Sequence, residues 1–364
     1  MLSLAGASNA APSTTISNTL PRYDALGRLM DVHDGNMLYH EGRYLYFGMG
    51  YGNCTEKKGW IPPWDCPGIY RPFGGCGFAL NHAVNVFSSA DLVSWTFEGD
   101  ALPQAARPVG IYFRPKVLFN RVTGEFVLWI NYLEQSSPGQ TPLSAYPNAT
   151  YLVAVSKSAA GPFMVVTPRA HTSVSGGGDF TLLASSEGSA YIAHNGWGNS
   201  HRLIVERLEP SYRDAVAATA TPPLTAKGNE APLLWERNGW FYLAYGATCC
   251  FCTEGAGARV LVSEHPLGPW NDTEIELNPK RHAWSADRVI RSQNNYVAPV
   301  ATTGGTVFLF TADLWGSAAD GLKSHDRQYW APLTFDDSRL PPRPAPLAWV
   351  DEFTIDLAHA APGA

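Results

Sequence analysis

The chain has 364 residues, a formal net charge of -6 and no run rich in Lys or Arg, which argues against a nucleic-acid partner. No stretch approaches the roughly 18 consecutive apolar residues of a membrane span, so we expect no membrane partner either. Abundant aromatic residues, together with 34 Gly and 28 Pro, favour an all-β fold of short strands joined by turns.

The first 22 residues are rich in Ala, Ser and Thr. They lack the basic start and apolar core of an intact signal peptide, so we interpret residues 1–22 as a disordered leader or the remnant of a signal. Residues 359–364 are interpreted as a tail. The chain between them, residues 23–358, is expected to fold as a single domain.

Five similar strand–turn–strand units follow one another along this domain. They cover residues 37–48, 117–132, 181–195, 233–246 and 298–314. The last four turn at Thr123-Gly124, Glu187-Gly188, Asn238-Gly239 and Gly304-Gly305. Most units precede a second strand-like pair, so we expect four strands in each. A sandwich or barrel would not predict five similar hairpins, so the prediction is a five-bladed β-propeller.

Six cysteines fall in two clusters. One holds Cys54, Cys66 and Cys76, and the other holds Cys249, Cys250 and Cys252. A zinc site needs a second matching pair beside Cys249 and Cys252, and the other three are spaced too widely, so the pattern favours disulfides over metal. Glycosylation sequons at Asn53, Asn148 and Asn271 add support for a secreted, extracellular protein.

Polar residues precede most of the five hairpins. Propellers bring the start of each blade's innermost strand to a central channel, and these positions hold Asp34, Phe113-Arg114, Asp179, Glu230 and Gln293. Crowded carboxylates raise each other's pKa, as a proton donor working near neutrality requires. Inverting glycoside hydrolysis uses two carboxyl groups roughly 6.5–9.5 Å apart, which facing blades can supply.

Several segments resemble glycoside hydrolase family 43, whose members are five-bladed propellers. The most specific is Gly228-Asn229-Glu230-Ala231-Pro232 with residues 238–243, which is similar to the segment bearing the general acid. Residues 33–37 with Gly42-Arg43-Tyr44 resemble the first blade, where the catalytic base normally lies. Residues 114–120, 178–182 and 292–293 are closer to the exo-β-1,3-galactanase branch. The likeness spans about residues 31–335.

The resemblance implies Glu230 as general acid and Asp34 as base. The galactanase branch lacks the first-blade aspartate and depends on a glutamine near the fifth blade, so Gln293 is a third catalytic candidate. Phe113 departs from the branch, because it stands where those members carry a carboxylate. The substrate-binding candidates are His33, Arg114, Asp179, Trp315 and Arg327.

Each candidate also has a structural interpretation. Glu230 could be a surface glutamate, Asp34 could be a turn former before Gly35, and Gln293 could be a core amide. Asp179 could cap the run of glycines before it, and Arg327 could be an exposed arginine in a salt bridge. Trp60 and Trp64, like Trp315, could stack on sugars or simply pack between blades.

We therefore predict a secreted, monomeric glycosidase that inverts configuration and cleaves galactose- or arabinose-containing saccharides. One alternative is a weakly active or inactive carbohydrate-binding propeller, and another is a different activity or a scaffold on the same fold. Members of the family often hold a calcium ion near a channel histidine, but the chain has no dedicated calcium loop. No cofactor or metal is predicted, and a structural calcium ion stays open.

Overall fold

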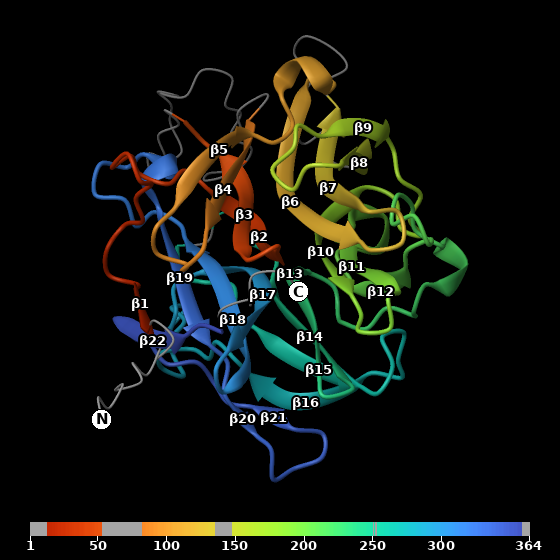
Figure 1. Ribbon diagram of the computed structural model, residues 1–364. Helices are drawn as coiled ribbons and strands as arrows, with labels where there is room; N and C mark the ends of the chain where they lie inside the picture. Colours follow the sequence, from red (N-terminus) through yellow and green to blue (C-terminus); the bar gives the residue numbers. More distant parts are fainter. Residues whose placement is uncertain (1–12, 53–81, 135–147, 250, 252, 359–364) are drawn as a thin grey trace, which may run out of the picture.

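The computed structural model describes residues 13–52, 82–134, 148–249, 251 and 253–358. Five β-sheets stand around a common axis as the blades of a propeller (Figure 1). The first strands of neighbouring blades contact one another in a closed ring, in the order β2, β6, β10, β13, β17 and back to β2. The predicted all-β, five-bladed propeller is confirmed.

Every blade is an antiparallel meander, in which strands that follow one another in the chain are neighbours in the sheet. The first blade comprises β2 (His33–His40), β3 (Arg43–Gly50), β4 (Ala83–Ser89) and β5 (Thr96–Asp100). The second comprises β6 (Gly110–Asn120), β7 (Glu125–Glu134), β8 (Thr150–Ser156) and β9 (Met164–Thr167). The third comprises β10 (Gly177–Ala184), β11 (Ala190–Gly196) and β12 (Ile204–Arg207).

The fourth blade comprises β13 (Asn229–Arg237), β14 (Trp240–Ala247), β15 (Arg259–Ser263) and β16 (Asn271–Glu276). The fifth comprises β17 (Gln293–Thr302), β18 (Gly305–Leu314) and β19 (Arg327–Pro332). Two further strand pairs join β1 (Ser13–Ser17) to β22 (Glu352–Asp356) and β20 (Phe335–Asp336) to β21 (Arg343–Pro344). The helices among the described residues are single 3-10 turns, η1 (Gln104–Ala106), η3 (Trp197–Asn199), η4 (Ala217–Thr219) and η5 (Lys323–His325). None is long and apolar enough to span a membrane.

The prediction of four strands in every blade is wrong for the third and fifth blades, whose described sheets have three. Other groups occupy the outer edge in each case. Thr221 donates its backbone N–H to the Val205 carbonyl and accepts the Val205 N–H on its Oγ1, each at 3.0 Å. The Asn18 amide bonds both main-chain groups of Trp330, at 2.8 and 2.9 Å. A fourth strand would need these same edge groups.

All five predicted hairpins are present. In the fourth, Arg237 pairs with Trp240, so Asn238 and Gly239 form a two-residue turn in which both φ values are positive, 51° and 77°. That geometry matches the twist of the flanking strands and suits the Asn-Gly sequence. In the fifth hairpin Thr302 pairs with Gly305, so its turn lies one residue earlier than expected.

The hydrophobic core is divided among the junctions between blades. Each of five clusters of buried residues joins two neighbouring blades. For example, Phe47 packs with Leu128 between the first and second, and Leu182 packs with Trp129 between the second and third. Packing of side chains therefore contributes to holding the blades together, because among the described strands none of one blade pairs with a strand of another blade.

The ring is closed by strands from both ends of the described chain. Strand β1 pairs with β22, and Ile16 and Ile355 enter the cluster between the fifth and first blades beside Trp330. Residues 1–22 were expected to be a disordered leader, but residues 13–17 of that segment form strand β1. Residues 1–12 and 359–364 lie outside the described residues.

Candidate active site

The beginnings of the five inner strands form one mouth of the channel, and each contains a β-bulge. The register shifts lie between His33 and Asn36, Phe113 and Lys116, Gly177 and Phe180, Glu230 and Leu233, and Asn294 and Tyr296. A bulge inserts one unpaired residue and redirects neighbouring side chains. Four of the five positions singled out from the sequence lie within or at the edge of these irregularities, and Gln293 lies one residue before the fifth.

Three bulges contain a residue in the left-handed region, which is uncommon for residues that carry a side chain. The φ angles are 60° at Asp34, 51° at Arg114 and 52° at Ala231. Gly35 completes the first bulge, because a Cβ there would lie 1.5 Å from the Phe47 carbonyl oxygen. The backbone is therefore held in a costly conformation where the candidate side chains begin, as is common at functional sites.

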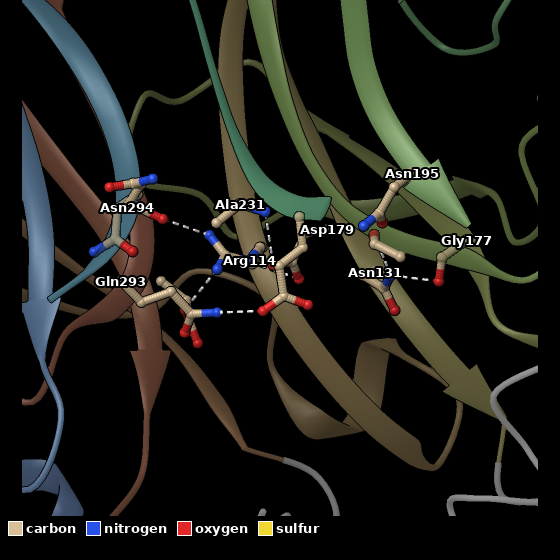
Figure 2. Close-up of polar contacts among 12 residues, drawn as sticks. Arg114, Asn131, Gly177, Asp179, Asn195, Ala231, Gln293 and Asn294 are labelled. Carbon is tan, nitrogen blue, oxygen red and sulfur yellow. Dashed lines mark hydrogen bonds and ion pairs between the residues drawn. The ribbon is translucent and has the colours of Figure 1, made fainter. Parts of the chain in front are cut away.

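Arg114 connects the second blade to three others. Its Nε donates to Asp179 Oδ1 at 2.8 Å, its Nη1 donates to the Asn294 carbonyl at 2.8 Å, and its Nη2 lies 3.8 Å from Asp34 Oδ1. Figure 2 shows Arg114 with Asp179 of the third blade and Asn294 of the fifth. Burial alone would lower the pKa of Arg114, but the nearby carboxylates, Asp179 first, raise it above its ordinary value. A permanent positive charge therefore lies at the centre of the site.

Glu230 lies partly exposed at the start of β13. Its Oε1 accepts the Cys249 backbone N–H at 2.7 Å and the Gln293 Nε2 at 2.9 Å. Burial and the charge of Asp179 raise the pKa of Glu230 well above its ordinary value, against the opposing effects of its hydrogen bonds and of Arg114. Both hydrogen bonds fall on Oε1, which leaves Oε2 to carry a proton.

Asp34 is 4% exposed and belongs to strand β2 rather than to a turn. Its Oδ2 accepts the Tyr51 hydroxyl at 3.1 Å. Burial raises the pKa of Asp34, the charge of Arg114 lowers it, and Asp313 and Asp179 raise it again, with a net upward shift. Two carboxyl groups of one channel mouth, Asp34 and Glu230, thus both have raised pKa values.

Asp313, in β18 of the fifth blade, contacts the residues at which the first blade begins. It accepts the Asp34 backbone N–H at 2.7 Å, lies 3.1 Å from His33 Nδ1, and accepts Asn295 Nδ2 at 2.8 Å. Burial alone would lower the pKa of His33, but its hydrogen bond to Asp313 and the charge of that residue raise it to about 9. His33 is fully buried, so its visible role is to support Asp34 from behind.

Gln293 links Glu230 to an aromatic wall. Besides its bond to Glu230, its Nε2 donates to the Cys249 carbonyl at 3.1 Å, and its Oε1 accepts Trp315 Nε1 at 2.9 Å. The Trp315 ring packs against Phe251 with their centroids 4.9 Å apart. The amide is thus oriented at both ends, and it lies in the site rather than in a core remote from it.

Lys116 supports the bulge that carries Asp34. This lysine is fully buried, and its Nζ donates to the carbonyls of Asp34 and Gly35 at 2.6 and 2.8 Å. Lys116→Met should destabilise the protein by about 1–3 kcal/mol, because two buried carbonyls lose their donor. Urea denaturation measures this free energy. Lys157→Met is the matched control, since exposed Lys157 also donates to a carbonyl, that of Thr123 at 2.8 Å. Equal effects of the two changes would contradict the supporting role.

Asp179 connects the third blade to the second and to the fourth at the channel mouth. Besides its ion pair with Arg114, its Oδ2 accepts the Ala231 backbone N–H at 3.1 Å. Its side chain is 21% exposed, so it remains accessible to a ligand. Asp179 therefore bridges Arg114 and the Ala231 backbone, in addition to following the run of glycines.

Arg327 lies apart from this network, at the start of β19. Its Nη1 donates to the Thr19 carbonyl at 2.9 Å, and its backbone N–H donates to Ser317 Oγ at 2.8 Å. The salt bridge considered for it is absent among the ion pairs of the described residues. Phe113 is half-buried and packs against the core between the first and second blades.

Some predictions lie outside the described residues. They concern Trp60 and Trp64, the sequon at Asn53 and every cysteine except Cys249, so the disulfide hypothesis stays a prediction. Within the described residues, no group of three or more His, Cys, Asp or Glu side chains is placed to hold a metal ion.

Sequence reasoning missed Asp313, Tyr51 and Lys116. Asp313 is the lone acid of the mainly apolar segment from Val307 to Trp315, and such a residue is a signal that could have been used. Tyr51 and Lys116 have no comparable signal, because aromatic residues and lysines near strand ends are common. Their roles depend on contacts between blades.

Comparison with known proteins agrees with this architecture. The protein-family model of glycosyl hydrolases family 43 matches residues 75–329. A comparison with curated proteins gives no match. A solved family 43 β-1,3-galactosidase is similar with a TM-score of 0.69 and 20% identity, over 94% of this chain and 64% of that chain. The exo-β-1,3-galactanase from Clostridium thermocellum gives 0.69 and 22%, over 93% and 66%. That from Phanerochaete chrysosporium, solved with galactose, gives 0.66 and 20%, over 91% and 67%.

The fold is that of a five-bladed β-propeller, and the family match assigns the chain to a class of such propellers. The chain spans 64% and 66% of the length of the first two of these structures, and at such identities the likeness shows the fold. The family model covers more than half of the chain. The chain belongs to glycosyl hydrolase family 43.

Proposed function

We propose that this protein hydrolyses galactose-containing saccharides with inversion of configuration, with Glu230 as general acid. The observation that carries the proposal is the environment of Glu230. Its pKa is raised, and both of its hydrogen bonds with described residues fall on one carboxyl oxygen. A protonated Oε2 at a channel mouth is what protonation of a leaving glycosidic oxygen requires.

Asp34 is the proposed base. It removes a proton from a water molecule, the water oxygen attacks the anomeric carbon, and the glycosidic oxygen leaves with the proton of Glu230. The Arg114 guanidinium forms ion pairs with Asp34 and Asp179. Its positive charge favours the ionised form of Asp34, the proposed base. Gln293 orients Glu230 and is the alternative group for positioning water.

Galactose is proposed as the sugar because solved structures of similar fold are named as β-1,3-galactosidase and exo-β-1,3-galactanases. Arabinose-containing saccharides are a second choice that the family accommodates. Phe113 supports a different possibility, a propeller that binds a glycan and turns over little, because an apolar side chain stands where the galactanase-like pattern has an acid.

Hydrolysis of β-1,3-galactan, arabinan and xylan, with release of reducing sugar, tests the proposal. We expect galactose from β-1,3-galactan, and proton NMR of the fresh product should show the α-anomer first. Binding of galactan without release of sugar would favour the binding alternative. An initial β-anomer would contradict inversion.

We further propose that the protein is secreted and that its two cysteine clusters form disulfides. The even number of cysteines and the three sequons support this. Thiol titration of the denatured, unreduced protein should find no more than about two free thiols among the cysteines. Recovery of all six as free thiols would contradict the disulfides and the oxidising compartment together.

A further inference from the structure

A groove beside the candidate active site combines positive charge with aromatic rings. It has a volume of about 650 Å³ and lies where β18 ends and β19 begins, next to the residues that precede β17. We call it the arginine groove. Among its lining residues are Thr253, Arg281, Arg291, Trp315, Arg327 and Trp349, and none of the described residues that line it is Asp or Glu.

The three arginines keep free hydrogen-bonding capacity. The Arg281 guanidinium has no hydrogen bond or ion pair with a described residue. Arg291 Nε donates to the Thr253 carbonyl at 2.9 Å and lies 4.0 Å from Asp287 Oδ1. Arg327 uses Nη1 on a carbonyl. Since each guanidinium carries five N–H donors, most of them remain available to a ligand. The groove is thus locally cationic in a protein of net charge -6.

The groove is connected to the candidate general acid. Trp315 forms part of its wall and donates to Gln293, which in turn donates to Glu230. Only two hydrogen bonds therefore separate a wall residue from Glu230. Trp349 is 40% exposed at the rim and offers an aromatic face to a sugar ring. A saccharide held at Glu230 could extend a neighbouring sugar unit or a branch into the groove.

We propose that the arginine groove binds an acidic sugar unit, one that bears a carboxylate or a sulfate, of the saccharide that is cleaved. Guanidinium groups recognise both anions through paired N–H donors, and an aromatic rim suits the sugar ring. This inference rests on the proposed function. It adds that the enzyme prefers galactans carrying an anionic unit next to the bond that is cleaved.

Calorimetric titration of the full chain tests the groove directly, with Glu230→Gln present so that the probes are not consumed. The probes are a neutral β-1,3-galacto-oligosaccharide, the same molecule with one glucuronosyl branch, and the same molecule with one sulfate. We expect an anionic probe to bind tighter by a factor on the order of ten at low salt, and its advantage to shrink as NaCl is raised.

The double change Arg281→Gln with Arg291→Gln should remove this preference. Arg121→Gln is the matched control, because Arg121 lines a cavity at the hairpin-turn end of the channel, and it should keep the preference. Tighter binding of the glucuronosyl probe alone assigns the groove to uronates, and tighter binding of the sulfated probe alone assigns it to sulfate esters.

Equal affinity for all three probes, or a preference that survives the double change, would overturn the groove inference. In that case hydrolysis of neutral galactan by the unmodified protein leaves the proposed function intact. If neutral galactan is neither bound nor hydrolysed, the proposed function fails and the groove inference falls with it.

Discussion

Glu230→Gln is expected to lower hydrolysis of a natural galactan by a factor of about 10²–10⁴, because it removes the transferable proton and keeps the shape of the side chain. A dinitrophenyl glycoside needs little protonation of its leaving group, so its hydrolysis should survive far better. Steady-state rates on both substrates give the comparison. Glu264→Gln is the control, since Glu264 is exposed at the end of the third strand of the same blade.

The same substitution has a signature in stability. The folded-state pKa of Glu230 is raised above 4.5, so the folded protein keeps a proton that the unfolded chain has lost, and this group makes the protein less stable as pH rises above 4.5. Gln does not titrate. The melting temperature of Glu230→Gln relative to the unmodified protein should therefore increase with pH. A constant difference, as expected for Glu264→Gln, would contradict the raised pKa.

Asp34→Asn should depress hydrolysis of the galactan and of the dinitrophenyl glycoside alike, each by a factor on the order of 10²–10⁴, because both reactions need an activated water. The reason to favour Asp34 over Gln293 is geometric. Both ends of the Gln293 amide are engaged, with Glu230 and Trp315, whereas among the described residues Asp34 Oδ1 has Arg114 Nη2 alone, at 3.8 Å.

Gln293→Ala is the paired experiment. It should impair galactan more than the activated substrate, since its visible role is to orient the acid. Asp100→Asn controls for loss of a carboxylate in the first blade, where Asp100 accepts the backbone N–H groups of Val84 and Leu102. If Asp34→Asn leaves both rates intact while Gln293→Ala abolishes them, Gln293 takes the role of the base. If neither change matters, the channel mouth is not the catalytic site.

Local patterns were enough to predict the blades. The turn at Asn238-Gly239 needs two residues with positive φ, and that requirement is written in the sequence. The strand counts were less predictable. The outer edges of the third and fifth blades are occupied by Thr221 and by the amide of Asn18, and the latter lies 312 residues from its partner Trp330.

The candidate site likewise has features that local sequence patterns predict and features that depend on contacts between distant residues. Glu230, Asp34 and Gln293 were identified because each begins an inner strand, a position that the repeat pattern defines. The contacts of Asp313 with His33 and with the Asp34 backbone, by contrast, join the fifth blade to the first. Such pairings depend on how the ring closes, which no local pattern encodes.

The pairing of β1 with β22 has a consequence for the order in which the blades can follow one another in the sequence. Ser13 of β1 lies directly opposite Asp356 of β22, so the two ends of the described chain already lie side by side. A short linker could join them, and new ends could be opened at an exposed hairpin such as Asn238-Gly239, on the side of the ring away from the channel mouth that holds Glu230. The order of the blades around the axis would be unchanged in such a circular permutant. A circular permutant would therefore change which blade is synthesised first, while the same blades would still meet at the site.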